Sequence, residues 1–148
     1  MKQLKVEADR GLEAIGDLRK KRARRLVEAI CEGARYLPDD QKALMSDIFE
    51  RGEPIARVAT RRAQCPRGLS RRVHRIAARV LDPRFRYVAE HQSQWRPTRR
   101  QVASACIIEG LSIREAAQKL QLSQYTVRKH KEAIDALCEE VTGPSVRR

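Results

Sequence analysis

The chain has 148 residues, a mass of 17.0 kDa and a formal net charge of +13 at pH 7. This length allows one compact domain or two very small ones and argues against an enzyme, so we expect a small helical protein without catalytic activity. No apolar stretch reaches the roughly 18 residues of a membrane span, and the N-terminus lacks the hydrophobic segment of a secretory signal, so we expect a cytoplasmic, nucleoid-associated protein with no membrane partner.

The first segment, residues 1–36, predicts one or two amphipathic helices. Three roles fit this segment: a helix that packs on the next unit, a helix that forms a homodimer, or an extension that binds DNA through the basic run at residues 19–25. Gly11 and Gly16 weaken the early part. The apolar residues at helical spacing are Leu4, Leu12, Ile15, Leu18, Leu26, Val27, Ile30 and Cys31.

The second segment, residues 37–89, predicts three helices joined by short turns. The first helix starts at residue 39 or 40 and ends at residue 49, before the break at Gly52. The other two helices cover residues 54–62 and 66–80, on either side of a turn around Cys65. Pro66 suits a first helical position, whereas Gly68 weakens that opening turn. The apolar stripe of the last helix is Leu69, Val73, Ile76 and Val80.

The third segment, residues 90–148, repeats this plan with clearer signals at the helix ends. Thr98 predicts the N-cap of a helix that runs through residue 108, and Gly110 ends that helix. Ser112 predicts the cap of a second helix, in which Glu115 completes a capping box. The small side chains in the middle of this helix let a neighbouring helix cross closely. Its expected buried side is Ile113, Ala116, Ala117 and Leu120.

A turn at residues 121–122 leads to the last helix, which Ser123 is expected to cap. The tail from Thr142 onward is expected to be disordered. The expected inward stripe of the helix is Val127, His130 or Lys131, Ile134, Leu137 and Val141. The expected outward stripe, which is polar and suits base edges and phosphates, is Gln124, Tyr125, Arg128, Lys129 and Glu132.

The second and third segments match each other when Gly110 is placed on Gly52, an offset of 58 positions without gaps. Apolar residues then coincide at helical spacing; the pairs are Leu44 and Val102, Ile48 and Cys106, Ile55 and Ile113, Ala59 and Ala117, Leu69 and Val127, and Ile76 and Ile134. A self-match at a fixed offset is typical of a duplicated supersecondary unit. The sequence therefore predicts an all-α fold with two tandem helix-turn-helix units related by internal duplication, preceded by a helical segment.

Positive charge is concentrated in the middle of the chain. Residues 51–100 carry 14 basic and 3 acidic side chains, whereas residues 1–50 carry 11 and 10. Of the 32 basic residues, 24 are Arg, the side chain that binds phosphate and guanine through two parallel hydrogen bonds. We therefore expect the first unit, residues 37–89, to contribute sequence-independent grip on DNA, and the second unit, residues 90–148, to contribute more of the sequence reading.

The cysteines and histidines do not form a metal-binding pattern. Cys31, Cys65, Cys106 and Cys138 are scattered, and no Cys-x-x-Cys pair occurs. Cys106 and Cys138 lie on apolar stripes and are interpreted as small core residues. No glycine-rich phosphate loop occurs either, so we expect neither a metal nor a nucleotide cofactor.

Three motifs of the third segment carry a family resemblance: Thr98-Arg-Arg-Gln-Val, Ile108-Glu-Gly-Leu-Ser-Ile-Arg-Glu-Ala-Ala, and Leu120-Gln-Leu-Ser-Gln-Tyr-Thr-Val-Arg-Lys-His. The chain from about residue 95 to 137 resembles the LuxR/GerE-type helix-turn-helix and is similar to region 4 of sigma factors. The resemblance implies that Arg128, Lys129 and Glu132 face bases, with Tyr125 and Thr126 near phosphates. Glu132 departs from the usual basic or neutral residue, and either accepts from a cytosine amino group or pairs with Arg128.

Each unit contains a set of residues that is predicted to bind DNA. At the offset of 58, Ser70, Arg71 and His74 match Arg128, Lys129 and Glu132. In the second unit the set is Gln124, Tyr125, Thr126, Arg128, Lys129, Lys131 and Glu132. In the first unit it is Arg67, Ser70, Arg71, Arg72, His74 and Arg75.

The combined patterns predict a sequence-specific regulator of transcription, of bacterial, phage or mobile-element origin, that binds double-stranded DNA. One alternative is a sigma-like factor or an activator, for which RNA polymerase or another regulator would be a partner. The other alternative is an architectural or recombination accessory protein, which would use the same surfaces with less sequence preference. The ratio of affinities for cognate and random DNA separates the regulator from the architectural protein.

Overall fold

The computed structural model describes residues 2–143, with side chains from Leu18 onward. These residues form eight α-helices and no strand, so the fold is all-α as predicted. Within the same residues, no helix combines the length and the apolar character that crossing a membrane requires. The helices are α1 (Lys2–Ala34), α2 (Asp39–Met45), α3 (Ile55–Arg61), α4 (Pro66–Leu81), α5 (Pro83–His91), α6 (Pro97–Ala103), α7 (Ile113–Leu120) and α8 (Gln124–Thr142).

Three shorter helical segments extend this set. A π-helical turn, Ser46–Glu50, continues α2, and a second one, Ser104–Ile108, continues α6. A single 3-10 turn, Gln92–Gln94, follows α5. The helices predicted at residues 39–49 and 98–108 are therefore present, each with one wide turn at its C-terminal end.

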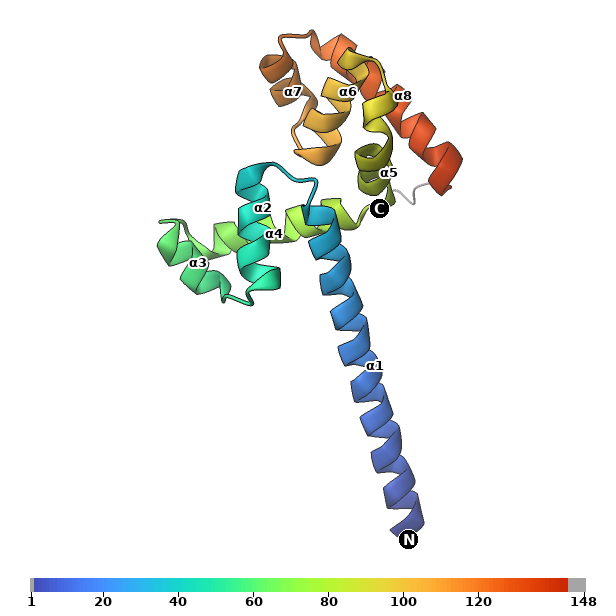
Figure 1. Cartoon of the computed structure of the whole chain (residues 1–148). Helices are drawn as coiled ribbons and strands as arrows, with labels where there is room; N and C mark the ends of the chain where they lie inside the picture. The colour runs from blue at the N-terminus through green and yellow to red at the C-terminus, as the bar shows by residue number, and fades with distance from the viewer. Residues whose placement is uncertain (1, 144–148) are drawn as a thin grey trace.

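The N-terminal segment is one continuous helix, which extends far from the rest of the molecule (Figure 1). Only its last turns pack on the body: Ile30 and Ala34 are buried, whereas residues 18–26 are exposed. α1 contacts α2, the π-turn after α2, and α4. A Cβ atom at Gly33 would collide with the side chain of Val80, so the glycine allows α1 and α4 to approach closely.

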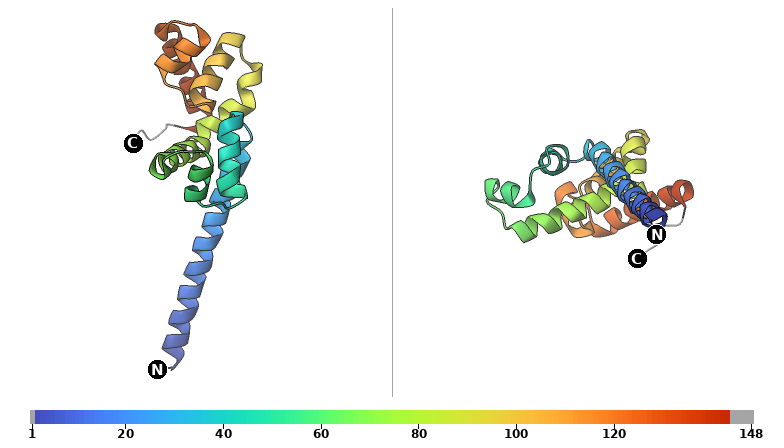
Figure 2. Two further views of the ribbon diagram at one scale, coloured as in Figure 1. Left: turned by 90° about the vertical axis from the view of Figure 1, so that its left-hand side faces the viewer. Right: turned by 90° about the horizontal axis from the view of Figure 1, so that it is seen from below.

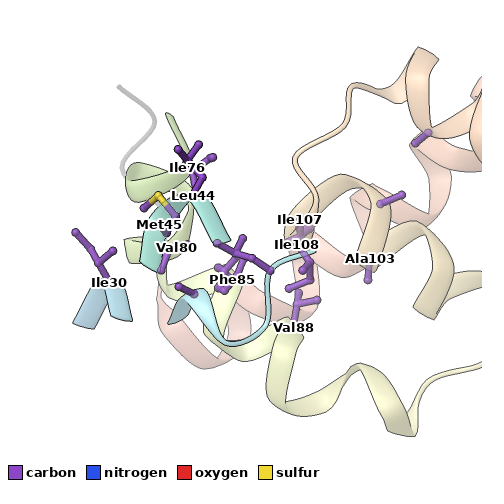
Figure 3. Close-up of a cluster of buried hydrophobic side chains, with 14 of the residues drawn as sticks. Ile30, Leu44, Met45, Ile76, Val80, Phe85, Val88, Ala103, Ile107 and Ile108 are labelled. Carbon is purple, nitrogen blue, oxygen red and sulfur yellow. The ribbon is translucent and has the colours of Figure 1, made fainter. Parts of the chain in front are cut away.

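One hydrophobic core joins the two halves of the body (Figure 3). Phe85 of α5 is 1% exposed and lies between a group around Leu44 and Val80 and a group around Val88 and Ile107. α5 contacts α4 on one side and α8 with the π-turn Ser104–Ile108 on the other. α5, which crosses the predicted boundary between the two units at residues 89 and 90, is therefore part of the core.

The polar caps of the last two helices match the sequence prediction. The Glu115 N–H donates to Ser112 Oγ at 3.1 Å, and the Ser112 N–H donates to Glu115 Oε2 at 2.9 Å, which completes a capping box. The Thr126 N–H donates to Ser123 Oγ at 3.1 Å. The prediction for Thr98 is wrong: α6 starts at Pro97 with Arg96 as its N-cap, because proline is pre-organised for the first helical position.

The far end of α8 also differs from the prediction. Val141 was expected to face inward but is 66% exposed, whereas Cys138 is fully buried. Val141 lies three residues beyond Cys138, in a last turn of α8 whose residues 139–142 are all exposed. Thr142, expected in a disordered tail, is the last residue of α8, and the helix ends at Gly143 with φ of +81°. Residues 144–148 of the predicted tail lie outside the described residues.

Candidate nucleic-acid interface

α7 and α8 form a tightly connected pair of helices. Ala116 and Ala117, the predicted small residues, are buried where α7 meets its neighbours α6 and α8. The chain turns through Gln121, which has a left-handed φ of +56°, and the Leu122 N–H donates to the Ala117 carbonyl at 3.0 Å. Three residues therefore separate α7 from α8, within the range of a helix-turn-helix connection.

The inner and outer faces of α8 are sharply different. Val127 and Ile134 are fully buried, and Leu137 is partly buried. The five residues predicted to face outward are all exposed, Tyr125 to 72%; they are Gln124, Tyr125, Arg128, Lys129 and Glu132. An amphipathic helix of this kind packs on its own domain through one face and presents polar groups through the other.

The cations on the outer face of α8 are free for a partner. Among the described residues, no carboxylate pairs with Arg128 or Lys129. Glu132 does not pair with Arg128 although the two are one turn apart. Two members of the predicted set are less accessible: Thr126 is partly buried with its Oγ1 2.8 Å from Ser123 Oγ, and Lys131 is partly buried.

α3 and α4 form a second pair with similar local geometry. Val58 and Ala59 are fully buried on α3. The turn passes through Ala63, with a left-handed φ of +52°, and the Gln64 N–H donates to the Ala59 carbonyl at 2.9 Å. Pro66 is the first residue of α4, as predicted. All four predicted inward residues of α4 are buried: Leu69, Val73, Ile76 and Val80.

The outer face of α4 carries arginines at every fourth residue. Arg67, Arg71 and Arg75 are exposed, and no carboxylate of the described residues pairs with them. Ser70 and His74 lie on the same face, where His74 Nδ1 is 2.7 Å from the Ser70 carbonyl oxygen. Positions spaced by four follow one side of a helix, so the three guanidinium groups form a continuous basic stripe.

Arg72, the remaining member of the predicted set, forms an ion pair with a carboxylate of the same chain instead. Its Nη2 donates to Asp40 Oδ2 at 2.6 Å, and Arg62 pairs with Oδ1 of the same carboxylate at 3.1 Å. The hydrogen bond from Arg72 is the main cause of a lowered pKa at Asp40. Arg72 therefore ties α4 to α2 and is only partly available to a ligand.

Internal ion pairs account for part of the positive charge between residues 51 and 100. Asp40, Asp47 and Glu53 pair with arginines around α3, and Asp82, Glu90 and Asp135 pair with arginines of α5. The paired arginines are Arg51, Arg61, Arg62, Arg72, Arg84 and Arg86. Of the eight arginines of this region that are in no ion pair among the described residues, the stripe on α4 holds three.

Two exposed arginines that the sequence analysis did not single out lie beside these faces. Arg57 and Arg114 are in the first turn of α3 and α7, the helices that precede α4 and α8. In helix-turn-helix proteins the first helix crosses the DNA backbone, and helix N-termini favour phosphate. The position of these two arginines near the start of α3 and α7 can be recognised in the sequence, but it led to no prediction.

The cysteines differ in their surroundings. Cys138 is fully buried, and burial, with some contribution from Asp135, raises its pKa to about 11. Burial also raises the pKa of the partly buried Cys106. Cys65 is exposed at the start of α4, where the N–H groups of Gly68 and Arg67 lower its pKa. Within the part of the chain that the structure describes, no three potential metal ligands lie together.

Comparison of the chain with protein families, curated proteins and solved structures gave no match.

Proposed function

We propose that this chain is a sequence-specific regulator of transcription that binds double-stranded DNA through two helix-turn-helix units, α3–α4 and α7–α8. The observation that carries the proposal is the outer face of α8, where Arg128 and Lys129 are exposed and free of carboxylate partners while the opposite face is buried. The DNA major groove admits one α-helix, and Arg and Lys bind guanine O6 and N7 there. In this proposal the protein performs no catalysis and needs no cofactor.

The matching bounds of the two halves support an origin by internal duplication. α2, α3 and α4 start at residues 39, 55 and 66, and α6, α7 and α8 start at 97, 113 and 124. Each start is thus displaced by 58 positions, the offset of the sequence match. The left-handed residues follow the same offset, with Gly52 and Ala63 matching Gly110 and Gln121. Both π-turns, Ser46–Glu50 and Ser104–Ile108, do so as well.

The two units have different roles in this proposal. The free cations on the outer face of α4 are three arginines on one stripe, and this density of positive charge favours contacts to phosphates. α8 adds the exposed side chains of Gln124 and Glu132, which can accept or donate hydrogen bonds at base edges. We therefore infer that α4 strengthens binding to any DNA and that α8 reads the sequence. The resemblance to LuxR/GerE-type and sigma region 4 units, which covers residues 95–137, agrees with the second part of this inference.

Selection of binding sites from a random duplex library tests the proposal directly. The selected duplex is expected to bind at least about 10³-fold more tightly than random duplex at physiological salt, the usual lower bound for a specific regulator. An architectural protein would bind both with similar affinity. Failure to bind any duplex at low salt would overturn the proposal, and a requirement for RNA polymerase would favour the sigma-like alternative.

A matched pair of double variants identifies the surface responsible. Arg128→Ala with Lys129→Ala removes two free cations from α8, and Arg51→Ala with Arg86→Ala removes two cations that pair with Asp47 and Glu90. Both double variants lower the net charge by the same amount. Only the first is expected to abolish the preference for the selected duplex.

A further inference from the structure

The projecting part of α1 has an uncovered apolar stripe. Figure 2 shows that α1 extends away from the body. In this part of the helix, Leu18 is 66% exposed and Leu26 is 50% exposed. Where α1 joins the body, the stripe continues into a groove of 330 Å³ between α1, α4 and α5. Ala29, Tyr36 and Leu81 are among the residues that line this groove, and the last two are themselves 47% and 39% exposed.

The sequence of α1 continues this stripe to its N-terminal end. Residues separated by three or four positions share one side of a helix. Within α1 this series is Leu4, Ala8, Leu12, Ile15, Leu18, Arg22, Leu26 and Ala29, with Arg22 as its one charged member. At about 1.5 Å per residue, the stretch from residue 4 to residue 26 is about 33 Å long.

The charge of α1 is divided between its halves. Residues 2–17 contain three basic and four acidic residues, whereas residues 18–34 contain six basic and two acidic residues. Two parallel copies would place both basic halves together, and like charges at that distance repel. Two antiparallel copies would place each strongly basic half beside the slightly acidic half of the other.

We propose that α1 forms an antiparallel two-helix interface with α1 of a second copy of this chain. Facing positions have residue numbers that add up to 30, which brings Leu4 to Leu26, Leu12 to Leu18, and Ile15 to Ile15. Arg22 then faces Ala8, between Glu7 and Asp9. Lys2, the first residue of each helix, then faces residue 28 of the other, next to Ala29 at the mouth of the groove.

The length of the apolar stripe in the sequence of α1 favours a second helix as its occupant. An isolated helix in water gains little from propensity alone, and proteins stabilise helices mainly by packing an apolar face. DNA would attract the basic residues 19–25 but offers nothing that requires leucines at positions 18 and 26. The interface does not depend on DNA binding, and its failure would leave the proposed function untouched.

Oligomeric mass measured without DNA is the first test. Sedimentation equilibrium over a dilution series is expected to give twice the chain mass of 17.0 kDa. The double variant Leu18→Gln with Leu26→Gln is expected to give the single chain mass, because both side chains are exposed in one chain and support no fold of their own. The control, Lys20→Gln with Arg24→Gln, alters the other side of the same helix and is expected to remain dimeric.

Disulfide trapping tests the orientation. Cys31, Cys65 and Cys106 are first changed to Ser, and buried Cys138 is kept. Leu4→Cys chains mixed with Leu26→Cys chains are expected to form a disulfide-linked dimer on oxidation, whereas Leu26→Cys chains alone are not. The reverse result would indicate a parallel pair and overturn the antiparallel interface.

A wild-type chain that stays monomeric throughout would overturn the inference altogether. If such a monomer also lost affinity for duplex DNA on the change Leu18→Gln with Leu26→Gln, this face of α1 would be assigned to DNA. If the wild-type chain is a dimer and the monomeric double variant binds duplex DNA with unchanged affinity, the role of the stripe is restricted to joining two chains.

Discussion

Gln41 Nε2 donates a hydrogen bond of 3.2 Å to the main-chain carbonyl of Glu109, 68 residues further along the chain. Arg79 donates to the side-chain oxygen of the same Gln41 and lies against Gly110. Burial lowers the pKa of Arg79. This cluster connects α2 and α4 to the break that precedes α7, so it holds the two proposed units in contact.

Gly110 and Gly52 provide a matched test of this cluster. Both have positive φ, +78° and +66°, but a Cβ atom would meet Arg79 at Gly110 and nothing within 4 Å at Gly52. We expect Gly52→Ala to lower the free energy of unfolding by about 1–2 kcal/mol through backbone strain alone. Gly110→Ala should cost about 1 kcal/mol more, because the guanidinium must move.

Urea unfolding followed by circular dichroism measures both changes. In a chain that already carries Arg79→Ala, Gly110→Ala should cost no more than Gly52→Ala, since the clash is then removed. Equal losses for the two glycine variants would contradict the close contact between Gly110 and Arg79.

The helix ends could be predicted because their signals are local. Each signal acts on neighbouring residues only. Ser112 with Glu115, and Ser123, cap the helix that follows, and Pro66 starts a helix through its fixed φ. The buried stripe of α4 was predicted for the same reason, since it depends only on the helical period. The N-cap of α6 was predicted wrongly at Thr98 because Pro97, one residue earlier, is the stronger signal for the start of a helix.

The contacts between helices could not be predicted from local patterns. The capture of Arg72 by Asp40 depends on how α2 lies against α4, and the exposure of Val141 depends on where the neighbours of α8 end. The position of α5 within the core depends on Phe85, whose partners come from both halves of the chain. Such features arise from tertiary packing. The helical period of the sequence indicates which face of a helix is buried, but not which helices cover it.

The inward face of α8 is tested by placing a carboxylate along it. Val127 and Ile134 are fully buried, so Val127→Asp and Ile134→Asp should each unfold the α7–α8 unit by burying an unpaired charge. Val141→Asp is the control, because that side chain is 66% exposed and the change should alter stability by no more than about 0.5 kcal/mol. Thermal unfolding measures all three; wild-type stability in both core variants would refute the assigned face.

Thiol reactivity should separate Cys65 from Cys138. The reactive form of cysteine is the thiolate; the pKa of Cys65 is lowered, whereas that of Cys138 is raised to about 11. At pH 8, iodoacetamide should therefore label Cys65 first and Cys138 only after denaturation. Mass mapping of the labelled peptides provides the measurement. Rapid labelling of Cys138 in the folded protein would show that its site opens readily.

Base reading by α8 predicts a loss that depends on the DNA sequence. Arg128→Ala or Lys129→Ala alone should weaken binding to the selected duplex by about 1–3 kcal/mol and relax the preference at one position of the site. Fluorescence anisotropy with single-base variants of the duplex measures both effects. Equal losses on selected and random duplex would restrict these side chains to phosphate contacts.

The arginine stripe of α4 predicts a change in salt dependence instead. Replacing Arg67, Arg71 and Arg75 together by Gln leaves the pair between Arg72 and Asp40 intact. Each lost phosphate contact should reduce the slope of log affinity against log salt by about 0.9, so the triple variant should bind all duplexes more weakly and with a slope lower by about 2–3. Sequence preference set by α8 should survive in the remaining binding.

A second triple variant controls for the loss of three charges in that experiment. Lys42, Arg51 and Arg86 are exposed cations outside α4 and α8, and their replacement by Gln lowers the net charge equally. Their loss should reduce affinity only slightly, because screening at about 0.15 M salt limits the reach of a distant charge to about 8 Å. If both triple variants changed affinity and slope alike, the stripe on α4 would face away from DNA. The first helix pair would then be a structural support for α7 and α8.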